Sequence, residues 1–223
     1  MTVLELSDVE YSYRRNAALK GVTLEVNAGE VVAITGVSGC GKSTLLHCAA
    51  GILTPDAGTV RVAGQDLAAL PEADRARLRR TQVGIVLQFG QLVPDLPLID
   101  NVALPLLLDG HERGAAHETA MHWLGQVGVA DEADAVPAEL SGGQTQRAAV
   151  ARALVTGPAV VLADEPTGSL DSRAGQELLE VLLRASRHRG AALVVVTHDN
   201  LVAASADREI RLRDGVIQHE VAL

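Results

Sequence analysis

The sequence predicts an α/β fold built on a parallel central sheet. Two observations support it: short runs of apolar or β-branched residues are typical of strands buried on both faces, and helical stretches lie between them. Strands that alternate with helices favour parallel pairing, because a parallel connection needs a crossover of about helix length. The predicted buried strands are residues 30–35, 83–87, 160–163 and 193–197, and the predicted helices lie near residues 72–80, 114–127, 142–155 and 172–188.

A smaller antiparallel sheet is predicted from a different pattern. Residues 3–11, 18–26 and 59–62 alternate between apolar and polar side chains, and turn sequences rich in Gly, Asn, Asp and Pro interrupt them. Further along, residues 209–213 and 216–220 flank Asp214-Gly215, which predicts a β-hairpin. The predicted architecture is therefore a parallel core sheet with an antiparallel β subdomain.

Composition limits the classes of protein to consider. The 223 residues are 48% hydrophobic and 2% aromatic, which suits one domain with a core of Val, Leu, Ile and Ala. The net charge of −9 argues against binding to nucleic acid, which requires clustered Lys and Arg. No apolar stretch approaches the ~20 residues that span a bilayer, and the N-terminus lacks a signal-peptide pattern, so we expect a cytoplasmic protein. Cys40 and Cys48 fit neither a disulfide framework nor a zinc site and are interpreted as packing residues.

The first chemical motif lies directly after a predicted strand, where residues 36–43 read Gly-Val-Ser-Gly-Cys-Gly-Lys-Ser. A strand, a glycine-rich loop and a helix in this order predict a phosphate-binding loop, whose amide groups point into one concavity. The Lys42 ammonium is placed to reach the β and γ phosphates, and the Ser43 hydroxyl is placed to ligate Mg²⁺. The predicted phosphate-binding residues are Gly36, Val37, Ser38, Gly39, Cys40, Gly41, Lys42, Ser43 and Thr44.

The second motif is an apolar strand, residues 160–163, that is followed by Asp164 and Glu165. Ligands bind at the carboxyl ends of parallel strands, so both carboxylates are expected to face the phosphates. Asp164 is the predicted magnesium ligand, and Glu165 is the predicted general base that polarises an attacking water. Taken alone, such an acid pair is equally well explained as a helix cap or a solvated turn. Together with the phosphate-binding loop, the catalytic interpretation is favoured.

The third motif, Leu140-Ser141-Gly142-Gly143-Gln144, opens a predicted helix. Ser141 can cap this helix while the glycines leave its first amides uncovered, which predicts a second anion site. The motif closely resembles the signature of ATP-binding cassette (ABC) ATPases, and the resemblance extends over essentially the whole chain. In that family the signature of one subunit closes over the nucleotide held by the other. The resemblance therefore implies that Ser141, Gly142, Gly143 and Gln144 contact ATP across a head-to-tail dimer of two copies.

The family resemblance also implies a fold and a set of cofactors. The expected fold is the P-loop NTPase fold of ABC ATPases in a single domain of residues 1–223, with a helical subdomain inserted at about residues 89–157. The expected cofactors are ATP and Mg²⁺. We expect an active ATP hydrolase, since no catalytic position carries a residue unable to do its chemistry.

Further positions match the family one by one. Tyr13 resembles the aromatic residue that stacks on adenine, with Tyr11 as the alternative. Gln88 resembles the glutamine that touches Mg²⁺ and senses the membrane partner, and Asp171 lies in a segment that resembles the loop at the dimer interface. His198 resembles the switch histidine that contacts the γ-phosphate. The residues that the resemblance assigns to catalysis are Glu165, His198, Gln88 and Lys42.

One position departs from the family pattern, because Thr145 stands where relatives more often carry an amide. Thr145 lies beyond the glycines, so contact with ATP is expected to survive. Residues 88–105 and 164–171 are similar to a branch of the family that serves lipoprotein release, macrolide export and cell division. That branch implies an integral membrane permease subunit as partner and a position on the inner face of the cell membrane.

The same branch implies a groove for the permease at the leucine- and proline-rich residues 92–107. These leucines could instead belong to the core of the helical subdomain. Two other functions stay open at this stage. The chain could be the ATPase of a nutrient importer, or an ABC ATPase that serves no transporter.

Overall fold

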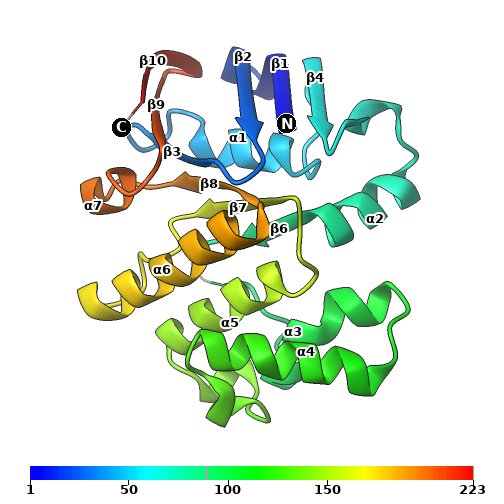
Figure 1. Ribbon diagram of the computed structural model, residues 1–223. Helices are drawn as coiled ribbons and strands as arrows, with labels where there is room; N and C mark the ends of the chain where they lie inside the picture. Colours follow the sequence, from blue (N-terminus) through cyan, green and yellow to red (C-terminus); the bar gives the residue numbers. More distant parts are fainter. Residues whose placement is uncertain (89, 223) are drawn as a thin grey trace.

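The central layer of the molecule is a largely parallel sheet (Figure 1). In the computed structural model, which describes residues 1–88 and 90–222, six strands form this sheet in the order β10-β9-β3-β8-β7-β6. Neighbouring strands are parallel except in the edge hairpin of β9 and β10. The strands are β3 (Val31–Thr35), β6 (Val83–Val86), β7 (Val160–Asp164), β8 (Ala192–Val196), β9 (Arg208–Arg213) and β10 (Val216–Ala222).

The strands at the centre of this sheet are buried on both faces, which explains their unbroken apolar sequences. In β3, Val31 and Ala33 join one hydrophobic core, whereas Val32 and Ile34 join a second core on the opposite face. All four side chains are at most 2% exposed. Parallel sheets are usually covered on both faces. The prediction that these apolar runs form buried parallel strands is therefore confirmed.

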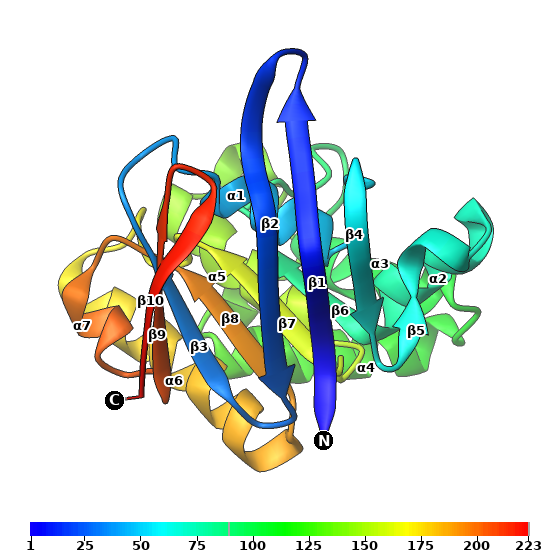
Figure 2. The same ribbon diagram turned by 90° about the horizontal axis from the view of Figure 1, so that it is seen from above.

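A second, antiparallel sheet has the strand order β2-β1-β4-β5 within the described residues. Helix α1 (Lys42–Ala49) lies between this sheet and the central sheet (Figures 1 and 2). Cys48 of α1 is fully buried in the core between the two sheets, and Cys40 is also buried, as expected for packing residues. The strands are β1 (Thr2–Tyr13), β2 (Asn16–Asn27), β4 (Ala57–Val62) and β5 (Gln65–Asp66).

Helices cover the opposite face of the central sheet (Figure 1). Helices α5 (Gly142–Leu154) and α6 (Ser172–Arg189) pack closest to it, and α3 (Leu98–Leu108) and α4 (Arg113–Gln126) pack together beyond α5. The remaining helices are α2 (Glu72–Gln82) before β6 and α7 (Asn200–Ala203) before β9, and short 3₁₀ turns lie at Leu67–Ala69, Ala130–Glu132 and Pro137–Glu139.

Helix α3 corrects one expectation from the sequence. Residues 92–107 do not form an open groove by themselves, because Leu98, Val102 and Leu106 are buried on one face of α3. Their spacing of four residues is that of a helix stripe. The sequence analysis did not predict this helix because Pro105 lies inside it, and proline lacks the amide that a helix interior needs. Leu98 and Leu106 are therefore core, as the alternative interpretation proposed, whereas Leu104 and Pro105 line a surface cavity.

One predicted feature falls outside the described residues, namely Phe89, which belongs to the segment after Gln88 and marks the approximate start of the expected helical subdomain. Among the helices formed by residues 1–88 and 90–222, none is both long enough and apolar enough to cross a membrane.

Candidate nucleotide-binding site

A cavity of about 720 Å³ lies where the central sheet meets the antiparallel sheet. Its walls come from the end of β1, the start of β2, the loop between β3 and α1, and the residues that follow β6, β7 and β8. The sequence-predicted residues that line it are Tyr13, Gly36, Ser38, Gly39, Gly41, Lys42, Ser43, Thr44, Gln88, Asp164, Glu165 and His198.

The loop between β3 and α1 packs tightly against β2 and β9. Gly41, the residue before α1, has a left-handed backbone with φ 109°. A Cβ atom on Gly41 would lie 2.5 Å from the carbonyl oxygen of Ala18, and one on Gly36 would lie 2.2 Å from the carbonyl oxygen of Leu212. Only glycine fits such contacts. The glycines therefore let the loop backbone approach β2 and β9 while its amide groups line the cavity.

Lys42 lies at the first turn of α1 with its ammonium folded over the loop. Its Nζ donates hydrogen bonds to the carbonyl oxygens of Gly36 at 2.8 Å and Val37 at 2.9 Å. The ammonium therefore lies over the loop that the sequence predicts to bind phosphate. The side chains of Val37 and Cys40 do not line the cavity: Val37 is 69% exposed, and Cys40 is buried behind the loop.

The acidic wall of the cavity begins at the end of β7. Asp164 closes this strand and is 7% exposed. Glu165 follows with φ 47°, an uncommon left-handed backbone for a non-glycine residue, and its amide donates to the carbonyl oxygen of Val196 at 2.9 Å. Strain of this kind often accompanies functional sites. Here it turns the Glu165 side chain from the strand into the cavity.

Glu165 contacts His198 directly. The Oε1 atom of Glu165 lies 2.6 Å from Nδ1 of His198, in a hydrogen bond between side chains. This hydrogen bond, and next the charge of the carboxylate, raise the pKa of His198 above its ordinary value, although the nearby Lys42 opposes the shift. The two residues come from neighbouring strands of the sheet, so its topology brings together positions that are 33 residues apart.

Tyr13 and Gln88 complete the predicted part of the cavity. Tyr13 lines it, whereas Tyr11 packs edge-on against the Tyr13 ring at a centroid distance of 5.0 Å. The structure also brings in Ala17 and Ala18 of β2, which the sequence did not single out. The sequence could have pointed to these two alanines only through their position in the hairpin opposite the end of β1, where Asn16 pairs with Tyr13.

The signature residues lie outside this cavity. Ser141 caps α5: its Oγ accepts a hydrogen bond from the amide of Gln144 at 3.2 Å, and Oε1 of Gln144 accepts one from the amide of Ser141 at 2.9 Å. Asp171 caps α6 in the same way, through the amide of Ala174 at 2.9 Å. Thr145 donates its hydroxyl to the carbonyl of Ser141 at 3.0 Å. A single chain therefore does not join its signature to its phosphate-binding loop.

Comparison with known proteins gives consistent matches. A family model described as "ABC transporter" matches residues 19–168. The lipoprotein-releasing system ATP-binding protein LolD of Geobacter metallireducens is 44% identical over 218 residues, 96% of this chain and 97% of the relative. The macrolide export ATP-binding/permease protein MacB of Salmonella typhi is 44% identical over 221 residues, 97% of this chain. The chain spans only 34% of that longer relative.

Solved structures agree with these sequence matches. The ATP-binding cassette MJ0796, in a dimeric post-hydrolysis state bound to ADP and Pi, superposes with a TM-score of 0.93 at 35% identity, covering 99% of this chain and 98% of that one. A second dimeric structure of MJ0796 gives a TM-score of 0.94 at 36% identity with the same coverage. The predicted α/β fold and family are confirmed: this chain belongs to the ABC transporter family and has the fold of its ATP-binding cassettes.

Proposed function

We propose that this chain is the ATP-binding and ATP-hydrolysing subunit of an ABC transporter complex. The observation that carries the proposal is the single cavity that joins the phosphate-binding loop, Asp164, Glu165 and His198. Each of these features alone has a structural explanation, whereas their convergence around one cavity matches the needs of phosphoryl transfer. The whole chain, residues 1–223, acts as one ABC ATPase domain with a helical subdomain at about residues 89–157.

The cavity residues divide the chemistry among them. Glu165 accepts a proton from the attacking water, while His198 and Lys42 donate hydrogen bonds to the transferring phosphoryl group. Tyr13 stacks on the adenine ring. These groups act mainly by position and charge, because phosphoryl transfer needs little covalent participation by the protein.

Three oxygen donors in the cavity suit Mg²⁺. They are the hydroxyl of Ser43, the amide carbonyl of Gln88 and the carboxylate of Asp164, all of which line the cavity together with Lys42. Mg²⁺ prefers such hard oxygen ligands and is usually held by one or two carboxylates together with substrate phosphates. When bound there, it would neutralise charge on the β and γ phosphates.

A second copy of the chain completes the site. Two facts support this: Ser141 and Gly143 begin α5 outside the cavity, and similar cassettes form dimers in solved structures. The amides of Gly142 and Gly143 lie at the positive end of α5, which favours a phosphate of the partner's nucleotide. Asp171, at the start of α6, would lie at the same interface.

An apolar cavity of about 470 Å³ is the proposed docking site of the permease. Its lining includes Leu104, Pro105 and Leu108 of α3 and Ile52 and Val83, together with the arginines Arg79, Arg80 and Arg152. Leu108 is 63% exposed and Ile52 is 46% exposed, so apolar side chains of this cavity are accessible to a partner. A cytoplasmic helix of the permease fits such a groove and holds the ATPase at the inner face of the membrane.

Export or mechanical transmission is favoured over import, because the sequence relatives named above are a macrolide export protein and a lipoprotein-releasing system protein.

The proposed function is tested with the Glu165→Gln variant. This variant should bind ATP with unchanged affinity and lose at least about 100-fold in turnover, since it removes the base and keeps the shape of the side chain. Glu118→Gln, on the exposed surface of α4, is the matched control and should hydrolyse ATP normally. Near-normal hydrolysis by Glu165→Gln would show that the base is a different residue.

A further inference from the structure

We propose that the turn between β9 and β10 is a positioning element for the nucleotide cavity, and that Gly215 in this turn sets the affinity for ATP. The inference rests on the proposed binding of ATP in this cavity. It concerns a residue that neither lines the cavity nor belongs to any of its motifs.

The backbone of Gly215 joins the two walls of the cavity. Its amide donates a hydrogen bond to the carbonyl oxygen of Cys40 in the phosphate-binding loop, at 3.0 Å. Its carbonyl oxygen accepts a hydrogen bond from the amide of Lys20 in β2, at 2.9 Å. Ala17 and Ala18 of that strand line the facing wall of the cavity. One buried residue therefore sets the spacing between the loop and β2.

The contact leaves no room for a side chain. Gly215 has φ 82°, and a Cβ atom there would lie 2.8 Å from the carbonyl oxygen of Ala18 and 3.3 Å from Cα of Leu19. The same oxygen of Ala18 limits Gly41 on the other side of the loop, at 2.5 Å from its would-be Cβ. Backbone atoms cannot yield as a flexible side chain can. Any substitution at Gly215 must therefore move the turn, β2 or the loop.

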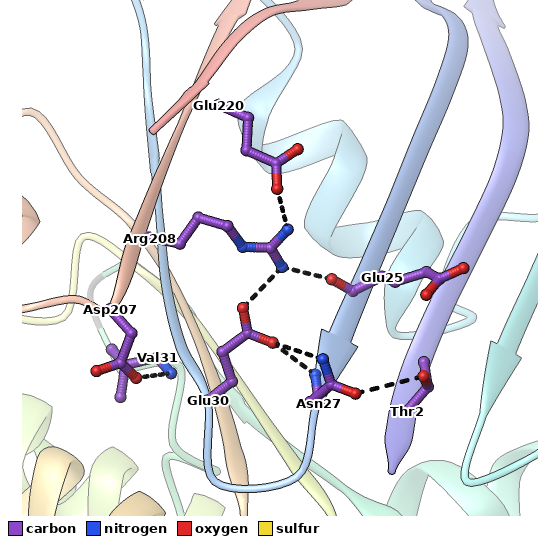
Figure 3. Close-up of polar contacts among 8 residues, drawn as sticks. All are labelled: Thr2, Glu25, Asn27, Glu30, Val31, Asp207, Arg208 and Glu220. Atoms are coloured by element: carbon purple, nitrogen blue, oxygen red, sulfur yellow. Dashed lines mark hydrogen bonds and ion pairs between the residues drawn. The ribbon is translucent and has the colours of Figure 1, made fainter. Parts of the chain in front are cut away.

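The other end of the β9–β10 hairpin also contacts β2, through Arg208 (Figure 3). Nη2 of Arg208, at the start of β9, donates to the carbonyl oxygen of Glu25 in β2 at 2.5 Å and pairs with the carboxylate of Glu30 at 2.9 Å. Nη1 of Arg208 binds the carboxylate of Glu220 on β10. The C-terminal hairpin thus holds β2 at two separated points, near Lys20 and near Glu25.

The contacts of Gly215 and Arg208 with β2 are important because the walls of the cavity belong to different sheets. The phosphate-binding loop extends from β3 of the central sheet, whereas Tyr13 and Ala18 belong to the antiparallel sheet. A rigid spacing between them pre-organises the site and lowers the entropy cost of binding. Gly215 hydrogen-bonds to the loop and to β2, whereas Glu165 and His198 follow other strands, β7 and β8. Lys42 is bonded to carbonyl oxygens within the loop itself, so it moves together with the phosphates that the loop binds. Loosening the turn should therefore weaken ATP binding much more than it changes the chemical step.

The test compares Gly215→Ala with Gly64→Ala in the ATPase. Gly64, in the turn between β4 and β5, has a similar φ of 77° but nothing within 4 Å of its would-be Cβ. Both variants carry similar backbone strain, so their difference reports the contact with Ala18 and Leu19. For Gly215→Ala we expect the Kd and KM for ATP to rise about tenfold with kcat changed less than twofold, since small displacements of binding groups have large effects. For Gly64→Ala we expect both constants to stay within twofold of wild type.

If Gly215→Ala does not fold, Arg208→Gln replaces it, because this change loosens the same hairpin without adding an atom near the loop. It should raise the Kd for ATP about threefold with kcat unchanged, a smaller effect because the turn itself is intact. The proposal is overturned if the folded variant binds ATP as tightly as Gly64→Ala, or if kcat falls while KM stays constant. Failure of the wild-type protein to bind ATP would instead refute the proposed function.

Discussion

At the scale of single residues, the contact between Glu165 and His198 links the proposed base to the proposed phosphate sensor. The carboxylate is 15% exposed and the imidazole 78% exposed, so the pair lies at the mouth of the cavity with the acid inside. The acid raises the pKa of His198, and so favours its protonated form, by hydrogen bonding and charge. A protonated His198 is a suitable donor to an incoming γ-phosphate.

The pKa of His198 gives a direct prediction. In the wild-type protein without nucleotide, an NMR titration should give His198 a pKa above the ordinary value of about 6.5, because Glu165 favours the charged imidazole. In Glu165→Gln the pKa should fall toward that value. Because the folded-state pKa is raised, the stabilisation by this pair is complete below pH about 6.5 and is lost as the pH rises through the raised pKa. Identical titration of His198 in both proteins would contradict this account.

At the scale of secondary-structure elements, Ser141 caps α5 and has a proposed second role at the partner's nucleotide, and one pair of variants can separate the two. Its hydroxyl caps α5, so Ser141→Ala should lower the free energy of unfolding by about 1 kcal/mol in chemical denaturation. Ser141→Asp keeps a cap and favours the positive helix end, so its stability should match wild type. The added carboxylate faces the partner's phosphate, however, and should abolish ATP-dependent dimers. A stable Ser141→Asp protein that still dimerises would show that the signature lies away from the nucleotide.

The sequence predicted those elements whose pattern is local. Buried strands such as β3 and β7 were recognisable because both of their faces are apolar, and the Asp214-Gly215 hairpin because its turn chemistry is specific. Helix α3 was missed because Pro105 interrupts its pattern. Asn101 on α3 was missed as well: it is fully buried, and its side chain binds the amide and carbonyl of Val93. Its role depends on tertiary contacts that no short window of sequence contains.

Some residues of the candidate site were likewise predictable from local sequence, and others were not. The glycine-rich loop, Asp164 and Glu165 follow from short motifs and were expected to face one ligand, which is the arrangement in the cavity. Ala17 and Ala18 could not be predicted, because their place in the wall depends on how one sheet packs on the other. The contact of Gly215 with Cys40 spans 175 positions in the chain for the same reason, so only the folded structure reveals it.

At the scale of the whole molecule, the two cavities lie on separate parts of the fold. The nucleotide cavity lies between the sheets, and the apolar cavity lies beside α3 and β6. Gln88 follows β6 and lines the first cavity, while Leu87 lines the second. Adjacent residues thus connect the proposed site of hydrolysis to the proposed site of the permease.

If the permease docks in the apolar cavity, a charged substitution there should prevent the two proteins from binding. Leu108→Asp should abolish recovery of a membrane protein with the tagged chain from detergent-solubilised membranes, as measured by mass spectrometry, because it replaces an exposed apolar contact with a hydrated carboxylate that docking would have to bury. Met121→Asp is the matched control, since Met121 is 40% exposed on α4 and does not line the groove. ATP binding by the isolated protein should be unchanged in both variants. Equal recovery of the membrane partner by the two variants would place the docking site elsewhere.

The proposed dimer encloses ATP between the phosphate-binding loop of one copy of this chain and the signature of the other. Sedimentation velocity of Glu165→Gln with ATP and Mg²⁺ detects this dimer, because the variant should hold ATP without hydrolysing it. We expect a dimer with ATP and a monomer without nucleotide, and a monomer under both conditions when Lys42→Ala is added. An unchanged sedimentation coefficient with and without ATP, in a protein that demonstrably binds the nucleotide, would contradict this proposal.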